Sequence, residues 1–225
     1  RQQAIEQLDT LTQAIFHEMF GDPVANDRCW PLFNLAEVCK KIQIGPFGSL
    51  LHESEYVEGG IPLVNPTHIS DGKIVPQEAK TINPEKHSSL KTYWLQEGDI
   101  VMGRRGEMGR CAIVTDVETG YLCGSGSLYL RLDQSKVLPI YVTSVLASQR
   151  GRYQLEKSAQ GITMLNLNSD IVGSFSMGVP PLAVQEHFSK TQARNSHAFE
   201  RSQQGLQELD ELFASLQQRA FRGDL

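Results

Sequence analysis

The sequence has few cysteines and no long apolar run. Its four cysteines are spread over 225 residues, and no two of them form a close CxxC pair. This spacing disfavours both a disulfide framework and a zinc ribbon. No segment approaches the roughly 20 apolar residues that span a bilayer, and Arg1, Gln2 and Gln3 begin no apolar signal region. We therefore expect a soluble, cytoplasmic protein.

The sequence also lacks the motifs of the common enzyme classes. It contains no GxxxxGK[ST] phosphate loop, no HExxH zinc helix and no GxSxG nucleophile turn. Its six histidines are scattered, and none pairs with a cysteine or carboxylate at ligand spacing. The segment Asn83-Pro84-Glu85 does not supply the Asn-Pro-Pro-Tyr element that positions a target amino group for methyl transfer. We therefore expect a non-catalytic protein with no metal site and no cofactor.

The net charge of −5 gives no general basic coat. Residues 1–22 carry one base and four acids, and residues 194–225 carry four bases and five acids. The two ends thus account for −4 of the net charge, and the central segment is close to neutral. A local basic patch on that segment remains compatible with nucleic-acid binding.

The two ends of the chain repeat each other. Leu8-Asp9-Thr10-Leu11 runs on to Phe20, and Leu209-Asp210-Glu211-Leu212 runs on to Phe221. Apolar residues spaced by three and four place each end on one helical stripe, as a coiled-coil seam requires. Two helices that merely cap one core are the alternative, but the shared register favours two equivalent helices. The predicted helix interface consists of Ile5, Leu8, Ile15, Leu206, Leu209, Phe213 and Leu216.

Prolines and the repeat set the expected domain boundaries. Pro180-Pro181 precede the second helix, which we expect over residues 182–225. The first helix, over residues 1–22, corresponds only to the last part of the second, so we expect the natural protein to extend upstream. Residues 23–181 then form the domain between the helices.

Short apolar runs separated by glycine and aspartate turns occupy this central segment. They predict the strands Ile61–Val64, Ile100–Met102, Ala112–Val114 and Leu128–Leu130. Shorter helices are expected around Leu35–Lys40 and Pro139–Ser148. The fold class is therefore α+β, with a mixed α/β domain of short twisted strands in one mixed sheet and long terminal helices that form a coiled-coil-like arm.

The best basic patch lies in the segment Gly103–Arg110, which has a glycine at every third position. It resembles half of a dinucleotide fingerprint, but a strand and not a helix is expected after it, so the phosphate-binding helix is missing. Arg104, Arg105 and Arg110 on such a turn can hold a phosphate chain. A hairpin with solvated arginines is the alternative. Within the arginine set, Arg104 could instead pair with Glu107 as a turn strut.

Two further loops carry side chains that can read base edges. The first, residues 40–49, contains Lys41, Gly45 and Ser49. The second, residues 158–168, contains Gln160, Thr163, Asn166 and Asn168. Amides can form paired hydrogen bonds with adenine, and Lys or Arg can do so with guanine. Each loop alone is typical of ordinary turns, but their combination with the arginines favours a DNA-reading surface.

A series of short motifs resembles the specificity subunits of type I restriction-modification systems in its order along nearly the whole chain. The motifs are Trp30…Leu35-x-Glu37-Val38, Gly45-Pro46-Phe47-Gly48-Ser49, Gly60-Ile61-Pro62-Leu63-Val64, Ile69-x-Asp71-Gly72, Gly98-Asp99-Ile100, Arg104-Arg105-Gly106-x-x-Gly109, Gly161-x-Thr163…Asn166, Pro180-Pro181-Leu182-x-x-Gln185 and Leu209…Leu216-Gln217-Gln218-Arg219-Ala220-Phe221.

The resemblance implies a function without chemistry of its own. In that family two target recognition domains are separated by two long antiparallel helices, and each domain reads half of a bipartite double-stranded DNA site through the major groove. The helices dock methyltransferase subunits, and the restriction endonuclease subunit completes the enzyme. This chain has one such domain, so it resembles a C-terminal half or a half-subunit that pairs with a second copy. The alternatives are the recognition portion of a fused restriction-methylation enzyme and a coiled-coil interaction scaffold.

Overall fold

The chain forms two units, and both of its ends belong to the same one. A computed structural model describes residues 2–159, 166–197, 201, 204, 205 and 221, with the backbone alone for residues 2–9. The terminal unit combines Arg1–Met19 with Glu186–Leu225, and the central unit is Phe20–Gln185. None of the helices in the described part of the chain is both long enough and apolar enough to cross a membrane.

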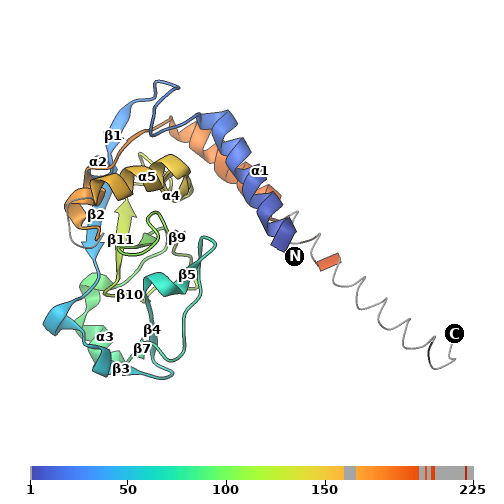
Figure 1. The fold of residues 1–225 in the computed structure, drawn as a ribbon. Helices are drawn as coiled ribbons and strands as arrows, with labels where there is room; N and C mark the ends of the chain where they lie inside the picture. The colour runs from blue at the N-terminus through green and yellow to red at the C-terminus, as the bar shows by residue number, and fades with distance from the viewer. Residues whose placement is uncertain (1, 160–165, 198–200, 202–203, 206–220, 222–225) are drawn as a thin grey trace. The chain divides into compact units, whose positions relative to one another are not determined.

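The terminal unit contains two helices that contact each other. Helix α1 spans Gln2–Phe20, and a second helix runs through residues 182–197, beginning where the proline pair predicts. The rings of Phe16 and Phe188 meet edge to face with their centroids 5.4 Å apart, and the two helices lie side by side (Figure 1). Of the predicted interface, Ile15 is half-buried. The side chains of Ile5 and Leu8, and residues Leu206, Leu209, Phe213 and Leu216, lie outside the described part.

The central unit contains a four-stranded antiparallel sheet in the order β2-β11-β8-β9. Its strands are β2 (Cys39–Ile44), β11 (Ser127–Leu132), β8 (Ile100–Gly103) and β9 (Cys111–Ile113). All four residues of β8 are buried, as expected for an apolar inner strand. Figure 1 shows helices beside this sheet, namely α2 (Leu35–Val38), α4 (Pro139–Ala147) and α5 (Gln149–Ser158), and the short helix α6 spans Ser169–Gly173.

A second four-stranded sheet has the order β10-β4-β7-β3. Its strands are β10 (Leu122–Cys123), β4 (Ile61–Val64), β7 (Thr81–Ile82) and β3 (Tyr56–Val57), and helix α3 (Pro84–Ser89) lies beside them in Figure 1. The pair β10 and β4 is parallel. Short 3-10 helices occupy Gly48–Leu50, Glu53–Glu55, Pro66–His68 and Lys91–Tyr93.

Two antiparallel ribbons complete the central unit. Strand β5 (Ile69–Ser70) pairs with β6 (Lys73–Ile74). Strand β1 (Leu32–Asn34) pairs with β12 (Ser176–Gly178), so Leu32 lies opposite Gly178. The segments that lead into and out of the central unit therefore meet in one ribbon.

The α+β class and the four predicted strands are confirmed, but the single mixed sheet is wrong. The strands divide between two four-stranded sheets and two ribbons. Glycines explain how the two larger sheets approach each other. A Cβ on Gly45 would lie 1.9 Å from the carbonyl oxygen of Gly124, and one on Gly124 would lie 2.2 Å from Oδ1 of Asn65. Neither position has room for a side chain, so the two sheets can approach this closely only with glycine there.

Candidate nucleic-acid interface

The glycine-rich turn of residues 103–110 joins β8 to β9, which is the hairpin that the sequence favours over a dinucleotide fold. The backbone N–H of Gly103 donates to the carbonyl of Arg110 at 3.0 Å and closes the turn. Gly106 and Gly109 have φ angles of 79° and 77°. A Cβ on Gly109 would also lie 2.4 Å from the carbonyl oxygen of Leu146 in α4. The glycines thus serve the turn and its packing on α4.

Arg104 is half-buried and attached to the segment before α6. Its Nε donates to the carbonyl of Leu167 at 2.7 Å, and the N–H of Leu167 donates to the carbonyl of Arg104 at 2.9 Å. Burial lowers the pKa of Arg104 below its ordinary value, and the positive charge of Arg105 lowers it further. Both effects penalise the charged guanidinium, and a nearby anion would offset them.

Arg110 forms an ion pair within the turn. Its Nη2 lies 2.7 Å from Oε2 of Glu107, while Nη1 of Arg152 lies 2.7 Å from Oε1 of the same carboxylate. The hydrogen bond from Arg110 holds the pKa of Glu107 below its usual range. The turn strut considered from the sequence therefore exists, but its arginine is Arg110 and not Arg104.

Arg105 differs from its two neighbours. It is exposed at the tip of the turn, and it takes part in no ion pair within the described ranges. Its guanidinium is therefore free to hold an anion. Of the three predicted phosphate-binding arginines, it is the one whose guanidinium is least engaged in contacts within the described part of the protein.

The second predicted loop leaves the same end of the first sheet. Gly45 and Gly103 flank Ser127, because the N–H of Gly45 donates to the Ser127 carbonyl at 3.0 Å and Gly103 pairs with Ser127 in the ladder. Gly45 is buried with its N–H occupied, whereas Ser49 is exposed. The loop 45–49 and the basic turn thus start on either side of one strand.

Lys41 lies within β2, where it is half-buried. Its Nζ is 3.4 Å from the carbonyl oxygen of Thr92 and 5.8 Å from the centroid of the Tyr129 ring. The register places Lys41 opposite Arg131, whose guanidinium also approaches the Tyr129 ring at 5.0 Å. The lysine is therefore partly committed to packing on this ring.

The third predicted loop is described only at its end. Gln160 and Thr163 lie outside the described residues. Asn166 has a buried Oδ1 with no hydrogen-bond partner in the part of the chain that the structure describes. Asn168 caps α6, because its Oδ1 accepts from the N–H of Ile171 at 2.8 Å. The amide oxygen of Asn168 is thus occupied, whereas that of Asn166 has no partner among the described residues.

Sequence reasoning missed two groups near these loops. Arg152 binds Glu107 across 45 residues of sequence, and only the folded structure brings them together. Phe47, in the middle of the loop 45–49, is 63% exposed. Its position between Pro46 and Gly48 was a usable signal, because a large apolar side chain in a tight glycine-proline turn has few neighbours to pack on. Within the described ranges, no group of three or more His, Cys, Asp or Glu side chains could hold a metal ion.

Comparison with known proteins identifies the fold. No protein-family model matches the sequence. The HsdS subunit from Thermoanaerobacter tengcongensis matches with a TM-score of 0.62 and 20% identity, over 100% of this chain and 53% of that one. A chain from the type I R-M system, solved to explain complex assembly and conformational transition, gives 0.63 and 20%, over 100% and 54%.

A third similar structure is the S subunit of a type I restriction-modification system from M. genitalium. Its TM-score is 0.59 at 15% identity, over 95% of this chain and 54% of that one. The chain thus spans about half the length of each of these three proteins. Its fold is that of one half of a type I restriction-modification specificity subunit.

Proposed function

We propose that this chain is a DNA-recognition subunit, or half of one, in a type I restriction-modification system. It binds one half of a bipartite double-stranded target and directs methyltransferase and restriction subunits to that site. The observation that carries the proposal is the fold match along the whole chain to half of HsdS and S subunits. Arg105, which is exposed on the turn between β8 and β9 and forms no ion pair among the described residues, supports it, because phosphate contacts supply much of the affinity for DNA.

We assign residues to the proposed DNA surface according to whether their polar atoms are already engaged within the fold. Arg105 and the Nη atoms of Arg104 hold phosphates, and Ser49 adds a hydroxyl on the neighbouring loop. Gln160, Thr163 and Asn166 have the chemistry to read base edges. Lys41 stays in the proposed surface as an accessory cation. Three residues leave it because a polar group of each is engaged within the fold: the N–H of Gly45, the Nε and Nη2 of Arg110 and the Oδ1 of Asn168.

The terminal helices are proposed to carry the protein partners. The contact between Phe16 and Phe188 supports a helix pair within one chain. We propose that the rest of the apolar stripe binds methyltransferase subunits or the helices of a second copy or second half. The chain itself performs no chemistry in this proposal, and the complex acts in the cytoplasm, where the DNA is.

The proposal is tested with the full chain assembled with its methyltransferase subunits. Random duplexes that bind are selected and sequenced, and binding of the selected and random duplexes is then compared at 50 and 200 mM salt. We expect one enriched motif and a steep loss of affinity with salt, about 0.5 logarithmic units per phosphate contact between 50 and 200 mM. Absence of any enriched motif would favour the interaction-scaffold alternative. Methylome sequencing of cells with and without the gene gives an independent check.

A further inference from the structure

A single carboxylate links the basic turn to a separate helix. The Oε2 atom of Glu107 accepts from Nη2 and Nε of Arg110 at 2.7 and 3.2 Å. Its Oε1 atom accepts from Nη1 of Arg152 at 2.7 Å, and Nε of Arg152 donates to the carbonyl of Ala147 at 2.9 Å. Glu107 therefore ties the basic turn to the junction of α4 and α5.

The other side of the same turn is tied by Arg104. The reciprocal hydrogen bonds between Arg104 and Leu167 fix the start of the turn to the residue before the cap of α6. Met108 is buried between these two attachments. Hydrogen bonds of Arg104 and ion pairs of Glu107 thus hold the turn on both sides of Arg105.

Electrostatics alone gives no reason for an acid at this position. Glu107 places a negative charge two residues from Arg105 and neutralises part of the charge of Arg110 and Arg152. Both effects reduce the attraction of the turn for a polyanion. An isolated turn with Gly103, Gly106 and Gly109 would, however, lose much conformational freedom on binding, which weakens affinity.

We infer that Glu107 is a positioning residue for DNA recognition, which orders the basic turn through Arg110 and Arg152 and thereby fixes Arg105 for selective binding. The inference rests on the proposed function, and it adds that selectivity depends on an acidic residue that repels DNA. Its consequence is that removal of this repelling charge weakens the preference for the target.

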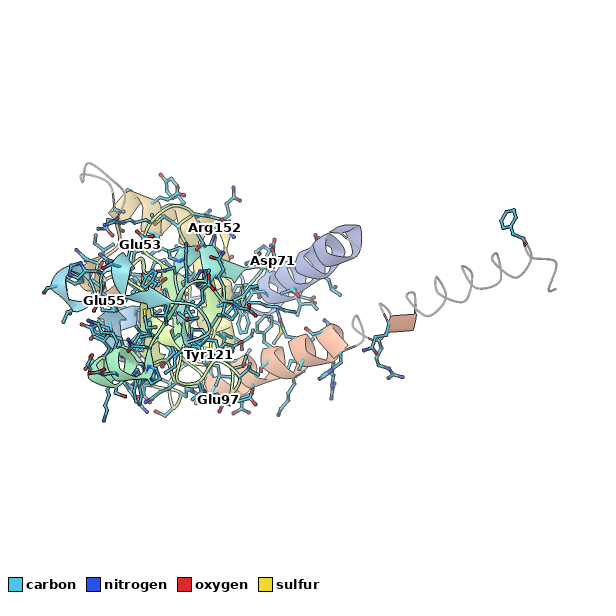
Figure 2. All side chains as sticks on the ribbon, turned by 90° about the horizontal axis from the view of Figure 1, so that it is seen from below. Glu53, Glu55, Asp71, Glu97, Tyr121 and Arg152 are labelled. Carbon is cyan, nitrogen blue, oxygen red and sulfur yellow. The ribbon has the colours of Figure 1, made fainter. Side chains whose placement is uncertain are left out.

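The test compares variants that change the net charge of the turn in different directions but all break the ion pair between Glu107 and Arg110. Glu107→Gln raises the net charge by one, Arg110→Gln lowers it by one, and the double variant restores it, while all three break the same ion pair. Glu97→Gln is the matched control, since Glu97 is exposed and lies far from Arg152 in Figure 2. The measured quantity is the ratio of affinities for the selected and the random duplex, with the full chain bound to its methyltransferase subunits.

We expect Glu107→Gln, Arg110→Gln and the double variant each to lower this ratio by about twofold to fivefold, the factor that a partly exposed ion pair contributes. Glu97→Gln should leave the ratio unchanged. Thermal unfolding of each variant shows that the fold is intact, and Arg110→Gln carries the same test if Glu107→Gln does not fold.

Two results would overturn the inference in different ways. Suppose that the wild type is selective and that Glu107→Gln keeps its affinity ratio while binding all DNA more tightly. Charge alone then sets the affinity of the turn for DNA, and the proposed function survives without a positioning role for Glu107. If the wild type has no preferred sequence, the proposed function fails, and the inference falls with it.

Discussion

Asp99 and Arg131 form a two-point ion pair within the first sheet of the central unit. Nε and Nη2 of Arg131 lie 2.9 and 2.7 Å from the two carboxylate oxygens of Asp99, which is only 1% exposed. Asp99 also accepts the N–H of Gln96 at 2.8 Å, and the guanidinium of Arg131 lies against the Tyr129 ring. A buried carboxylate with every oxygen engaged is costly to disturb.

Asp99→Asn should therefore destabilise the protein. The amide removes the charge that Arg131 needs and points an N–H group toward another donor, so we expect a loss of about 2–4 kcal/mol in the free energy of unfolding. Urea unfolding of the full chain measures this loss. Asp116→Asn, at an exposed position, is the control and should change it by less than about 0.5 kcal/mol. Equal stability of the two variants would contradict the prediction.

The glycines of the basic turn should differ in their tolerance of alanine. Gly109→Ala combines an unfavourable φ of 77° with a Cβ only 2.4 Å from a backbone oxygen, so we expect a loss of about 3 kcal/mol or more. Gly106→Ala has a φ of 79° but open space around it, so only about 1–2 kcal/mol should be lost. Thermal or urea unfolding compares them, and a larger effect at Gly106 would argue against the described turn.

The aromatic contact between the terminal helices should carry much of their association. Phe188 is fully buried, so Phe188→Ala should cost about 3–5 kcal/mol where the helices unpair. Hydrogen exchange of residues 10–20 and 182–197 reports this loss directly, since opening of the pair exposes their amides. Phe47→Ala removes a ring that is 63% exposed and should leave exchange unchanged. Full protection in Phe188→Ala would show that other contacts hold the pair.

Thiol chemistry should separate one cysteine from the other three. Burial raises the pKa of Cys39 and of Cys111 to about 12, and it raises the pKa of Cys123 as well. Because pH 8 lies below these pKa values, the three thiols stay protonated and react slowly with a disulfide reagent. Cys29 is exposed. We expect one fast equivalent with 5,5′-dithiobis(2-nitrobenzoate), its loss in Cys29→Ser, and four equivalents in denaturant; two fast equivalents would contradict the buried assignments.

Arg105→Gln should weaken binding to both the selected and the random duplexes. The change removes one phosphate contact, so the slope of log affinity against log salt concentration should fall by about one unit in magnitude. Lys190→Gln, on the helix of residues 182–197 in the other unit, makes the same charge change. Unchanged affinity and slope in Arg105→Gln would move the DNA surface away from this turn.

Local features of the fold were predictable from the sequence, and long-range pairings were not. The strand Ile61–Val64 has the predicted bounds, because branched apolar residues stand between a glycine pair and an Asn-Pro turn. Its parallel partner β10 lies about 60 residues later, and nothing in either segment specifies that pairing. Helix α5 was missed because it is polar and begins near Gly151, which packs against the carbonyl of Val145.

The candidate site shows the same division. Glycine spacing located the basic turn correctly, since positive φ angles and close packing both require glycine there. The partner of Glu107 was ambiguous, because Arg104 and Arg110 are each three residues away from it. The hairpin geometry turns Arg110 toward the acid and Arg104 toward Leu167, and sequence spacing cannot encode that choice.

The ribbon of β1 and β12 has a consequence for how such proteins diversify. Asn34 and Ser176 are paired neighbours. The 141 residues between them therefore leave the flanking chain and return to it at the same ribbon. A different segment whose ends form the same ribbon would fit in their place, and the flanking chain would keep its path. Under the proposed function, exchange of this whole segment between genes would replace the recognised DNA sequence in a single recombination event.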